Sequence, residues 1–388
     1  MNWKAGAAAL GVLAGGLAAC REATAPEPQA PPEITRAVPG QYIVVFRDGV
    51  INPALLAGQL VRSKAGSLRF TYTSALQGFA ATLSEEAARQ LAQDPRVAYV
   101  ERDQEFRVDA TQSMDANGDP WGLDRVDQQA LPLSRTYTYT ATGAGVHAYI
   151  IDTGIWTLHA DFGGRANNVY DAFGATGEDC HGHGTHVAGT VGGATYGLAK
   201  GASLHGVRVL SCVGLGLTSQ IIAGIDWVRQ NAIKPAVANM SLGGGLSTAL
   251  NTATTNLWNS GVFVAVAAGN DNVDACTASP ASATGAFTAA SSTKTDAKSS
   301  FSNWGSCVEG YAPGSAIVSD FLLGTTMSLS GTSMASPHVA GVAVLYKAVN
   351  GDQPSATVSN WIITNSTAGV ITGNPAGTPN RLLSKSTL

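Results

Sequence analysis

Short β-branched runs and longer helical patterns alternate along most of the chain. Within residues 40–109 the order is strand, helix, strand, strand, helix, strand, at 42–46, 53–62, 68–73, 78–83, 84–93 and 97–101. Ser84, followed by two glutamates, supplies a cap and an acidic first turn for the second helix. This order predicts a small split α/β sandwich, an α+β domain.

The pattern changes within residues 110–388. Apolar, partly β-branched runs of strand length occur at 146–151, 207–210, 237–242 and 262–268, separated by helical or glycine-rich stretches. Such alternation predicts an α/β fold whose mainly parallel sheet is covered by helices on both faces. Active-site groups are then expected at the carboxyl ends of the strands.

The first twenty residues carry one charge, Lys4, and a short apolar stretch that ends in Leu-Ala-Ala-Cys. This pattern predicts a secretory signal peptide over residues 1–20 rather than a spanning helix. The last four residues resemble a bacterial lipobox, in which Cys20 would be lipidated; an ordinary signal cleaved nearby is the alternative. Residues 21–39, rich in Pro, Ala and Glu, predict a flexible tether.

Charge density falls sharply near residue 110. Ten basic and eleven acidic side chains lie in residues 21–109, against twelve and sixteen in the much longer stretch 110–388. We therefore expect two units, 40–109 and 110–388. The net charge of −4 and the lack of a basic run exclude a nucleic-acid partner. The hydrophobic share of 45% excludes a disordered chain.

Four cysteines follow Cys20, namely Cys180, Cys212, Cys276 and Cys307. Four cysteines allow three connectivities, and export favours disulfides over free thiols. Pairing nearest neighbours closes two loops of about 30 residues, each stabilising by about 2–4 kcal/mol. The spacing alone leaves the pairing open.

Three segments carry residues capable of catalysis. Asp152 ends an apolar run, residues 179–186 hold three histidines, and residues 331–338 lead into an apolar helix expected from 339 to about 349. Taken singly, the aspartate and Ser333 could be turn or helix caps, and the histidines could bind zinc. The segment has no HExxH pattern and a disulfide would use its cysteine, so zinc is the weaker interpretation.

Taken together, an aspartate, a histidine and a serine are the parts of a nucleophile, its base and the group that orients the base. Their chain order is Asp, His, Ser. An α/β-hydrolase needs Gly-x-Ser-x-Gly and the order Ser, Asp, His, whereas residue 335 is alanine. A chymotrypsin-like enzyme has histidine before aspartate and an all-β pattern.

The segments resemble those of subtilisin-like serine proteases, specifically the proteinase K and aqualysin branch, over nearly all of residues 110–388. This resemblance implies that Asp152 orients the imidazole, His183 acts as base and then acid, and Ser333 attacks the scissile carbonyl. Asn270 and the Ser333 N–H would bind the oxyanion. The motifs that carry it are Asp152-Thr153-Gly154, His183 to Thr190, Asn239 to Gly244, Ala267 to Asn270 and Gly331 to Ala335.

The same resemblance implies the substrate-binding surfaces of a broadly specific endopeptidase. A wide apolar pocket would accept hydrophobic or aromatic residues before the cut, and a strand edge would pair with the substrate main chain. It also implies pairing of Cys180 with Cys212 and of Cys276 with Cys307, and structural roles for His181 and His186. The expected pocket walls are Ser241, Leu242, Gly243, Gly244, Ala267, Ala268 and Gly269, and the expected edge is Gly214, Leu215 and Gly216.

Residues 40–109 resemble the inhibitory propeptide of this family, and residues 110–113 an aqualysin-type mature start. We therefore expect self-cleavage close to Asp109. A lipid on Cys20 would then stay with the propeptide, and the mature protease, acting on polypeptides as a monomer, would be soluble. A catalytically silent scaffold with the same fold is the alternative function.

No cofactor is expected for catalysis, but the resemblance implies structural calcium. Glu309 would bind it with the carbonyls of Thr284 and Ala286. A second family site is matched in part by Asp124, Asp127 and Gln128, with Ser134 where an acidic ligand is wanted. In the polar insertion 114–119, Asp115, Asn117 and Asp119 could hold calcium, but a solvated turn is favoured because Gly118 is misplaced for an EF-hand.

Overall fold

The computed structural model describes residues 37–107, 111–113 and 120–388. Cys20, most of the predicted tether, the expected cleavage point near Asp109 and the polar insertion at 114–119 lie outside the described residues.

The first described part has the strand and helix order that its sequence predicts. Its sheet is antiparallel, in the order β2-β3-β1-β4. The second helix begins directly after Ser84, whose hydroxyl accepts the Ala87 N–H at 3.1 Å, so the predicted cap is confirmed. The elements are β1 (Ala37–Phe46), α1 (Pro53–Ser63), β2 (Ser67–Tyr72), β3 (Gly78–Thr82), α2 (Glu85–Ala92) and β4 (Val97–Arg107).

A nine-stranded sheet forms the centre of the second part. Its order is β18-β19-β15-β14-β12-β10-β6-β8-β7, and its pairs are parallel except β18 with β19. The strands are β6 (His147–Asp152), β7 (Ala166–Asp171), β8 (Ser203–Arg208), β10 (Ala236–Met240), β12 (Phe263–Ala267), β14 (Phe287–Ser292), β15 (Gly310–Pro313), β18 (Thr367–Ala368) and β19 (Arg381–Leu382).

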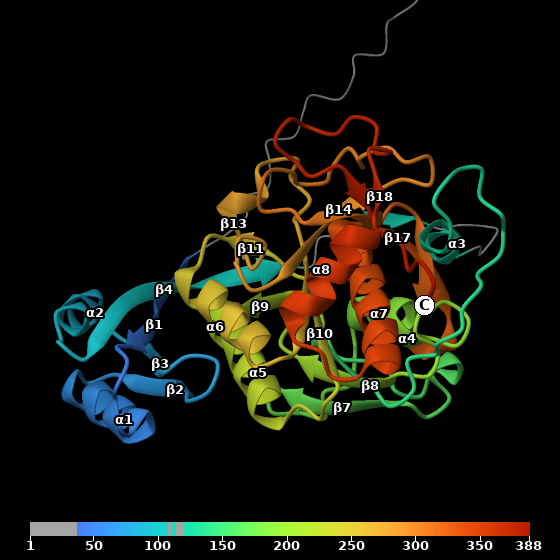
Figure 1. Ribbon diagram of the computed structural model, residues 1–388. Helices are drawn as coiled ribbons and strands as arrows, with labels where there is room; N and C mark the ends of the chain where they lie inside the picture. The colour runs from blue at the N-terminus through green and yellow to red at the C-terminus, as the bar shows by residue number, and fades with distance from the viewer. Residues whose placement is uncertain (1–36, 108–110, 114–119) are drawn as a thin grey trace, which may run out of the picture. The chain divides into compact units, whose positions relative to one another are not determined.

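Helices and shorter strands surround this sheet (Figure 1). The helices are α3 (Trp121–Asp127), α4 (His183–Gly192), α5 (Thr218–Asn231), α6 (Thr248–Asn259), α7 (Thr332–Asn350) and α8 (Ser355–Asn365). The short strands are β5 (Thr111–Ser113), β9 (Leu215–Leu217), β11 (Gly244–Gly245), β13 (Ala278–Ser279), β16 (Ile317–Asp320) and β17 (Thr326–Ser330), and the 3₁₀ turns are η1 (Ala160–Phe162), η2 (Ala275–Thr277) and η3 (Leu322–Gly324).

The two faces of the sheet carry separate apolar cores. Ile150 points into a core with α4 and α7, whereas the next residue, Ile151, points into a core with α5 and α6. Successive side chains of a strand point to opposite faces, so a strand covered on both sides must be apolar throughout. The predicted fold class, a mainly parallel sheet between two helical layers, is confirmed.

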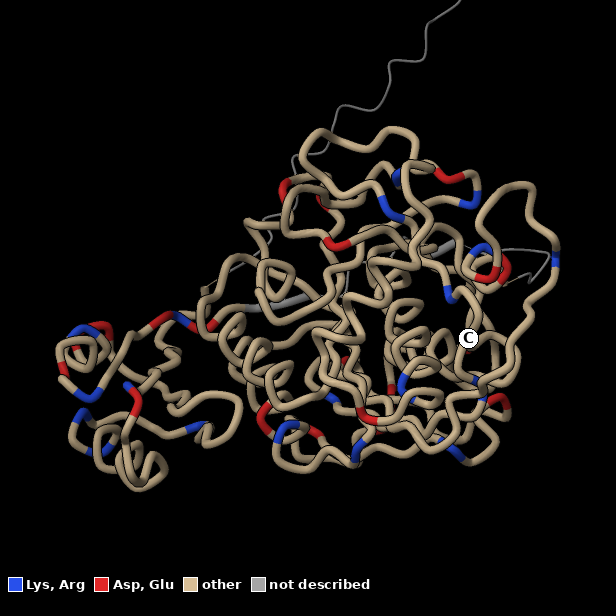
Figure 2. The backbone as a smooth tube through the Cα atoms, viewed as in Figure 1, with Lys and Arg blue, Asp and Glu red and all other residues tan. Residues whose placement is uncertain are grey.

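The sheet of the first part also uses both faces. On β1, Val44 packs with α1 and α2, while Ile43 and Val45 join the core that contains α5 and α6. The alternation therefore gives this small sheet an apolar face that meets the two helices of the catalytic part. Figure 2 shows that charged residues are dense along residues 37–107 and sparse elsewhere, as the composition indicates.

The boundaries of several elements differ from the sequence prediction. Helix α7 begins at Thr332, seven residues before the expected start at 339, so Pro337 lies in its second turn. Strand β8 begins at Ser203 instead of 207, because His205 and Gly206 interrupt the apolar run without interrupting the strand pairing. Among the described residues no helix has the length and apolar character needed to cross a bilayer.

Candidate active site

Asp152 is the last residue of the central strand β6. Its side chain is fully buried, and its Oδ1 accepts the Thr153 N–H at 2.7 Å. The chain then turns at Gly154, where φ is +99° and an added Cβ would lie 2.2 Å from the Gly177 carbonyl oxygen. Glycine is required at this position, because other residues strain at positive φ and would collide with that backbone.

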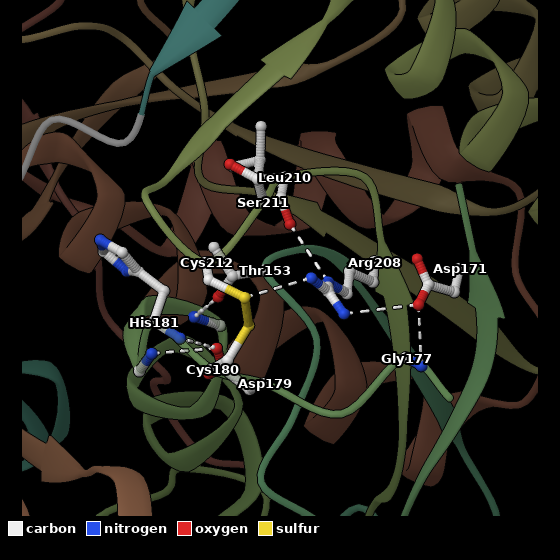
Figure 3. Close-up of a disulfide and its surroundings, with 12 residues drawn as sticks. Thr153, Asp171, Gly177, Asp179, Cys180, His181, Arg208, Leu210, Ser211 and Cys212 are labelled. Atoms are coloured by element: carbon white, nitrogen blue, oxygen red, sulfur yellow. Dashed lines mark hydrogen bonds and ion pairs between the residues drawn. A yellow bond between two sulfur atoms is a disulfide. The ribbon is translucent and has the colours of Figure 1, made fainter. Parts of the chain in front are cut away.

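His183 opens helix α4, and its imidazole Nδ1 lies 2.8 Å from Asp152 Oδ1. Two side chains, those of Asp179 and Thr153, hold this end of the helix. Asp179 accepts the N–H groups of His181, Gly182 and Thr185, and the Thr153 hydroxyl accepts the N–H of Gly184. Figure 3 shows Asp179 beneath this turn, beside the disulfide. The turn and the strand end are thus fixed to each other where imidazole and carboxylate meet.

Ser333 is the second residue of α7. Pro337, four residues later, has no N–H to donate, so the Ser333 carbonyl loses its intrahelical partner. The hydroxyl of Ser241 donates to that carbonyl at 2.7 Å instead. Asn239 donates to Ser241 Oγ at 2.8 Å and accepts the Ser336 hydroxyl at 2.6 Å. A buried polar chain from β10 thereby positions the turn that carries Ser333.

The structure joins two of the three predicted catalytic residues by a hydrogen bond. His183 Nδ1 contacts Asp152, but His183 Nε2 is buried without a hydrogen-bond partner among the described residues. The Ser333 hydroxyl donates to the Ser241 carbonyl at 3.2 Å. Helices α4 and α7 pack against each other, and each bears its predicted residue in its first turn.

Asn270 follows strand β12, and its side chain is tied to the serine turn. Its Oδ1 accepts the N–H of Thr332 at 2.8 Å and the Thr332 hydroxyl at 3.0 Å. The same hydroxyl accepts the Gly269 N–H at 3.0 Å. Because Oδ1 faces Thr332, the amide nitrogen of Asn270 points to its other side. Asn303 holds the loop by donating to the Ala268 carbonyl and accepting the Asp271 N–H.

A pocket lies beside Ser333 and Asn270. Six of the seven residues expected in its walls do line it, namely Leu242, Gly243, Gly244, Ala267, Ala268 and Gly269. Ser241 does not: it is fully buried behind the pocket, where it bonds to the Ser333 carbonyl. Thr332, from the motif that holds Ser333, also lines the pocket, as do Ala278, Ser279, Ala281 and Asn303, which no local motif in the sequence marks.

The expected substrate edge is paired with the chain's own strand β4. Strand β9 pairs antiparallel with it, Glu105 opposite Leu217, Phe106 opposite Gly216 and Arg107 opposite Leu215. This edge therefore accepts an added strand. Three residues after the end of β4 the chain enters β5, which pairs antiparallel with β17, the strand that leads to Ser333. Backbone pairing thus occurs on both sides of residues 108–110.

Two carboxylates of β4 cap helices of the catalytic part. Asp103 accepts the Ser219 N–H at 2.8 Å and the Ser219 hydroxyl, at the start of α5. Glu101 accepts the Ser247 hydroxyl and the Ala249 N–H at the start of α6. Unpaired N–H groups and the positive end of the helix dipole favour a carboxylate there. In the other direction, Asp226 of α5 accepts the N–H groups of residues 74 and 75.

The cysteines pair as the family resemblance implies, Cys180 with Cys212 and Cys276 with Cys307. The first disulfide links the turn before His183 to the loop before β9 (Figure 3).

The histidines near His183 do not converge on a common point. His186 is fully buried, and its Nε2 faces the carbonyls of Ile317 and Met327. Burial lowers the pKa of His186 to about 3, so the ring is neutral. Groups of three or more His, Cys, Asp or Glu able to hold a metal are absent from the described part of the chain.

The two implied calcium sites differ in how well their residues fit a cation. Glu309 is partly buried and its Oε2 accepts one donor, the Thr288 N–H, but burial raises its pKa to about 7, so a bound cation would offset an unfavourable charge. At the second site the carboxylate oxygens already have donors. Asp124 accepts from Ser134 and from the Arg135 N–H, and Asp127 lies 3.0 Å from the Lys385 ammonium. Those residues do not fit calcium.

A carboxylate, an imidazole and a helix-borne serine beside a pocket are the parts of a serine hydrolase built on a parallel sheet. Comparison with known proteins narrows this class. The subtilase family model matches residues 143–382, and the peptidase inhibitor I9 model matches residues 41–109. The chain belongs to the subtilase family, as a subtilisin-like serine protease with an I9 propeptide.

Related proteins support both assignments. An extracellular serine proteinase of Thermus sp. (strain Rt41A) is 48% identical over 375 residues, covering 90% of each chain. Alkaline serine exoprotease A of Vibrio alginolyticus is 47% identical over 365 residues, covering 89% of this chain and 67% of the relative. The crystal structure of a cold-adapted subtilisin-like serine proteinase, 50% identical, matches with a TM-score of 0.67 over 69% of this chain and 98% of its own.

Proposed function

We propose that the chain is an endopeptidase that cleaves peptide bonds through an acyl-enzyme on Ser333. The observation that carries the proposal is the 2.8 Å contact of buried Asp152 with His183 Nδ1. A buried carboxylate in this position keeps hydrogen on Nδ1 and leaves Nε2 as the base. Nε2 has no other hydrogen-bond partner among the described residues, as a base awaiting a proton requires.

In the proposed reaction the Ser333 hydroxyl first changes its hydrogen-bond partner. The Ser333 hydroxyl, which now donates to the Ser241 carbonyl at 3.2 Å, turns about its Cα–Cβ bond to donate to His183 Nε2. Catalytic hydrogen bonds of this kind often form fully only when substrate is bound. His183 then takes the hydroxyl proton as Oγ attacks, and returns it to the leaving amine. Water, activated by the same imidazole, hydrolyses the ester.

The negative charge on the carbonyl oxygen would be held by two donors. One is the Ser333 N–H, at the positive end of α7, and the other is the side-chain amide of Asn270. Asn270 is suited to this role because Thr332 binds its oxygen from the opposite side. Loss of one such donor typically lowers turnover by about 100- to 1000-fold.

The pocket beside Ser333 supports specificity for the residue before the cut. Its lining is dominated by glycine, alanine and Leu242, with Asp271 as its only carboxylate among the described residues. Small apolar walls admit a hydrophobic or aromatic side chain. A peptide library should give the highest kcat/KM for these residues. Strand β9 can pair with an added strand, as its pairing with β4 indicates. This supports recognition of the substrate through its main chain, and therefore broad specificity.

The propeptide would inhibit by occupying the β9 edge, with self-cleavage close to Asp109. The pairing of β4 with β9, and of β5 with β17, the strand that leads to Ser333, supports this position. We further propose export of the chain, by analogy with its extracellular relative. A lipid attached at Cys20 would remain on the propeptide; mass spectrometry that finds it on the processed catalytic chain would contradict this.

Fluorophosphonate labelling tests the function directly. The parent protein should incorporate one probe per chain on Ser333, and Ser333→Ala should incorporate none. Unfolded parent protein is the control for nonspecific reaction. A correctly processed protein that takes up no probe and cleaves no peptide would favour a catalytically silent scaffold. N-terminal sequencing of the processed chain locates the cleavage point, and a start far from residue 110 would contradict the processing model.

A further inference from the structure

The disulfide of Cys180 and Cys212 lies at the surface beside the active site. Both of its cysteines are exposed, whereas Cys276 and Cys307 of the other disulfide are half-buried. A small nucleophile from solvent therefore reaches the first disulfide more easily. This disulfide joins the turn before His183 to the loop that leads into β9, the expected substrate edge (Figure 3). A reagent that opens it acts on the site without entering the pocket, whose lining includes neither cysteine.

A positively charged side chain is fixed beside one of the two sulfurs. Arg208 is the last residue of β8, and its Nη2 lies 3.5 Å from Cys212 Sγ, to which it can donate. The rest of the guanidinium is held by Asp171, by the Leu210 carbonyl and by the ring of Phe173. The Arg208 side chain is only 11% exposed, so water screens its charge poorly. The sulfur thus has a preorganised cationic donor (Figure 3).

The two sulfurs differ in how well each would leave. In thiol–disulfide exchange a thiolate attacks one sulfur while the other departs as a thiolate, and a neighbouring cation favours that departure. Cys212 has the guanidinium beside it. Cys180 instead follows the buried Asp179, whose carboxylate already accepts the N–H groups at the start of α4. A thiolate is therefore favoured at Cys212 and disfavoured at Cys180.

We propose that Cys180 is a modification site, to which a low-molecular-weight thiol becomes attached by exchange with this disulfide. The incoming thiolate attacks Cys180 Sγ and forms a new sulfur–sulfur bond there. The bond to Cys212 breaks, and its electron pair goes to Cys212 Sγ, where Arg208 stabilises the thiolate. One disulfide is exchanged for another, so no further oxidant or reductant is consumed. Attack of Cys212 on Cys180 expels the thiol again, which makes the modification reversible.

The two segments that the disulfide joins differ in what else holds them. The turn before His183 keeps the four backbone hydrogen bonds that Asp179 and Thr153 accept. Among the described residues, the backbone hydrogen bonds of residues 211–214 are local, as from the Ser211 N–H to the Leu215 carbonyl. Opening the disulfide therefore leaves the imidazole in place and loosens the loop that orders β9.

The exchange is tested on the full chain with Ser333→Ala, which prevents self-digestion, and Cys20→Ser, which removes the thiol outside the disulfides. The folded protein is incubated with glutathione at mildly alkaline pH and quenched with acid. Free thiols are then alkylated, and the peptides are analysed by mass spectrometry. Glutathione should be found on Cys180 and the alkyl group on Cys212, while the other disulfide stays intact.

Variants of the arginine test its part in the exchange. Arg208→Gln should form the adduct about tenfold more slowly, and Arg208→Lys, which keeps a cation, should stay closer to the parent. Arg381→Gln, in β19 and far across the sheet from β8, should react as the parent does. Should Arg208→Gln fail to fold, the position of glutathione in the parent still decides. Attachment at Cys212, faster opening of the other disulfide, or an Arg208→Gln rate equal to or above that of the parent overturns the proposal.

The effect on catalysis rests on the proposed function and is measured separately. Self-processed enzyme with and without the adduct is assayed on an extended peptide and on a short ester. The adduct should raise KM for the peptide about tenfold, because a loosened edge must be ordered on binding, and should leave kcat for the ester nearly unchanged. Unmodified enzyme that hydrolyses neither substrate would refute the proposed function but not the exchange. An adduct that leaves KM for the peptide unchanged would refute the loosening of β9.

Discussion

Asp320 is a buried acid at the end of β16, and its replacement by asparagine should stabilise the protein at alkaline pH. Neither of its carboxylate oxygens has a hydrogen-bond donor among the described residues. It faces Asp161, and His159 Nδ1 lies 3.5 Å from its Oδ1. Burial, and next the negative charge of Asp161, raise the pKa of Asp320 to about 8. Near neutral pH it therefore carries the proton of the pair.

Asp161 is the ionised partner. Burial raises its pKa, but hydrogen bonds from the Thr195 hydroxyl and N–H outweigh that effect and lower it. Helix α4 passes close to both acids, because an added Cβ at Gly193 would lie 2.5 Å from Asp161 Oδ2 and 2.7 Å from Asp320 Oδ2. The backbone at the end of α4 therefore lies against both carboxylates.

The sign and size of the effect follow from proton linkage. In the unfolded chain Asp320 titrates near about 3.9, so the folded state holds the extra proton between about pH 4 and pH 8. Its contribution to stability is complete below pH 4 and is lost as the pH rises through 8. Four pKa units at 1.36 kcal/mol each set an upper bound of about 5 kcal/mol. Relaxation and water entry reduce this, and we expect about 2–3 kcal/mol.

Asparagine imitates the protonated acid, since its amide can donate to Asp161. Asp320→Asn should thus gain little over its parent at pH 5 but about 2–3 kcal/mol at pH 9, which is about 4–6 °C in the unfolding temperature of a domain this size. Calorimetric scans of the Ser333→Ala chain at both pH values measure the gain. Asp171→Asn, which removes an acid paired with Arg208, should show no alkaline gain. An equal shift at pH 5 and pH 9, or none at pH 9, refutes the reasoning.

Three further changes probe the site, the propeptide and the cluster around Asp124 and Asp127. Thr332→Val removes one donor to the Asn270 oxygen. Steady-state kinetics should therefore show that kcat falls about tenfold while KM is nearly unchanged. An unchanged kcat would contradict the positioning role of Thr332. Asp103→Ala removes the cap of α5. After processing, protease activity should then appear at least about ten times faster than in the parent. An unchanged lag in a progress curve would refute the capping argument. Lys385→Gln removes the ammonium group from Asp127. Calcium should then raise the unfolding temperature of this variant more than that of the parent. Equal shifts would disprove the idea that the ammonium group takes the place of calcium.

Local signals in the sequence predict most of the fold. Apolar runs locate β6, β10 and β12 within one or two residues, and Ser84 gives the start of α2, because burial on both faces or a missing cap would be costly at those places. Strand β7 has no such signal: its sequence, Ala-Asn-Asn-Val-Tyr-Asp, is polar because it lies at the edge of the sheet. Its position is fixed by pairing with β8, which the sequence does not display.

In the candidate site, too, the sequence predicts the roles of some residues and not of others. Asp152, His183 and Ser333 were accessible because each begins or ends an element within a recognisable motif. The roles of Thr332 and Ser241 could not be predicted, because they depend on partners far away in the chain. Thr332 donates to the Asn270 oxygen, and Ser241 donates to a carbonyl that Pro337 leaves without a helical donor. The start of α7 was misplaced for a related reason, since a proline so near the start of a helix is expected in its first turn.

Strand pairing, helix caps and apolar contacts join the propeptide to the catalytic part. The cleavage that we propose near residue 109 would break neither the pairing of β4 with β9 nor the caps that Glu101 and Asp103 place on α6 and α5. Ile43 and Val45 also keep their apolar contacts. The β9 edge thus stays blocked after the bond is cut. Activity must follow dissociation or destruction of the propeptide, and should lag behind processing by the lifetime of these contacts.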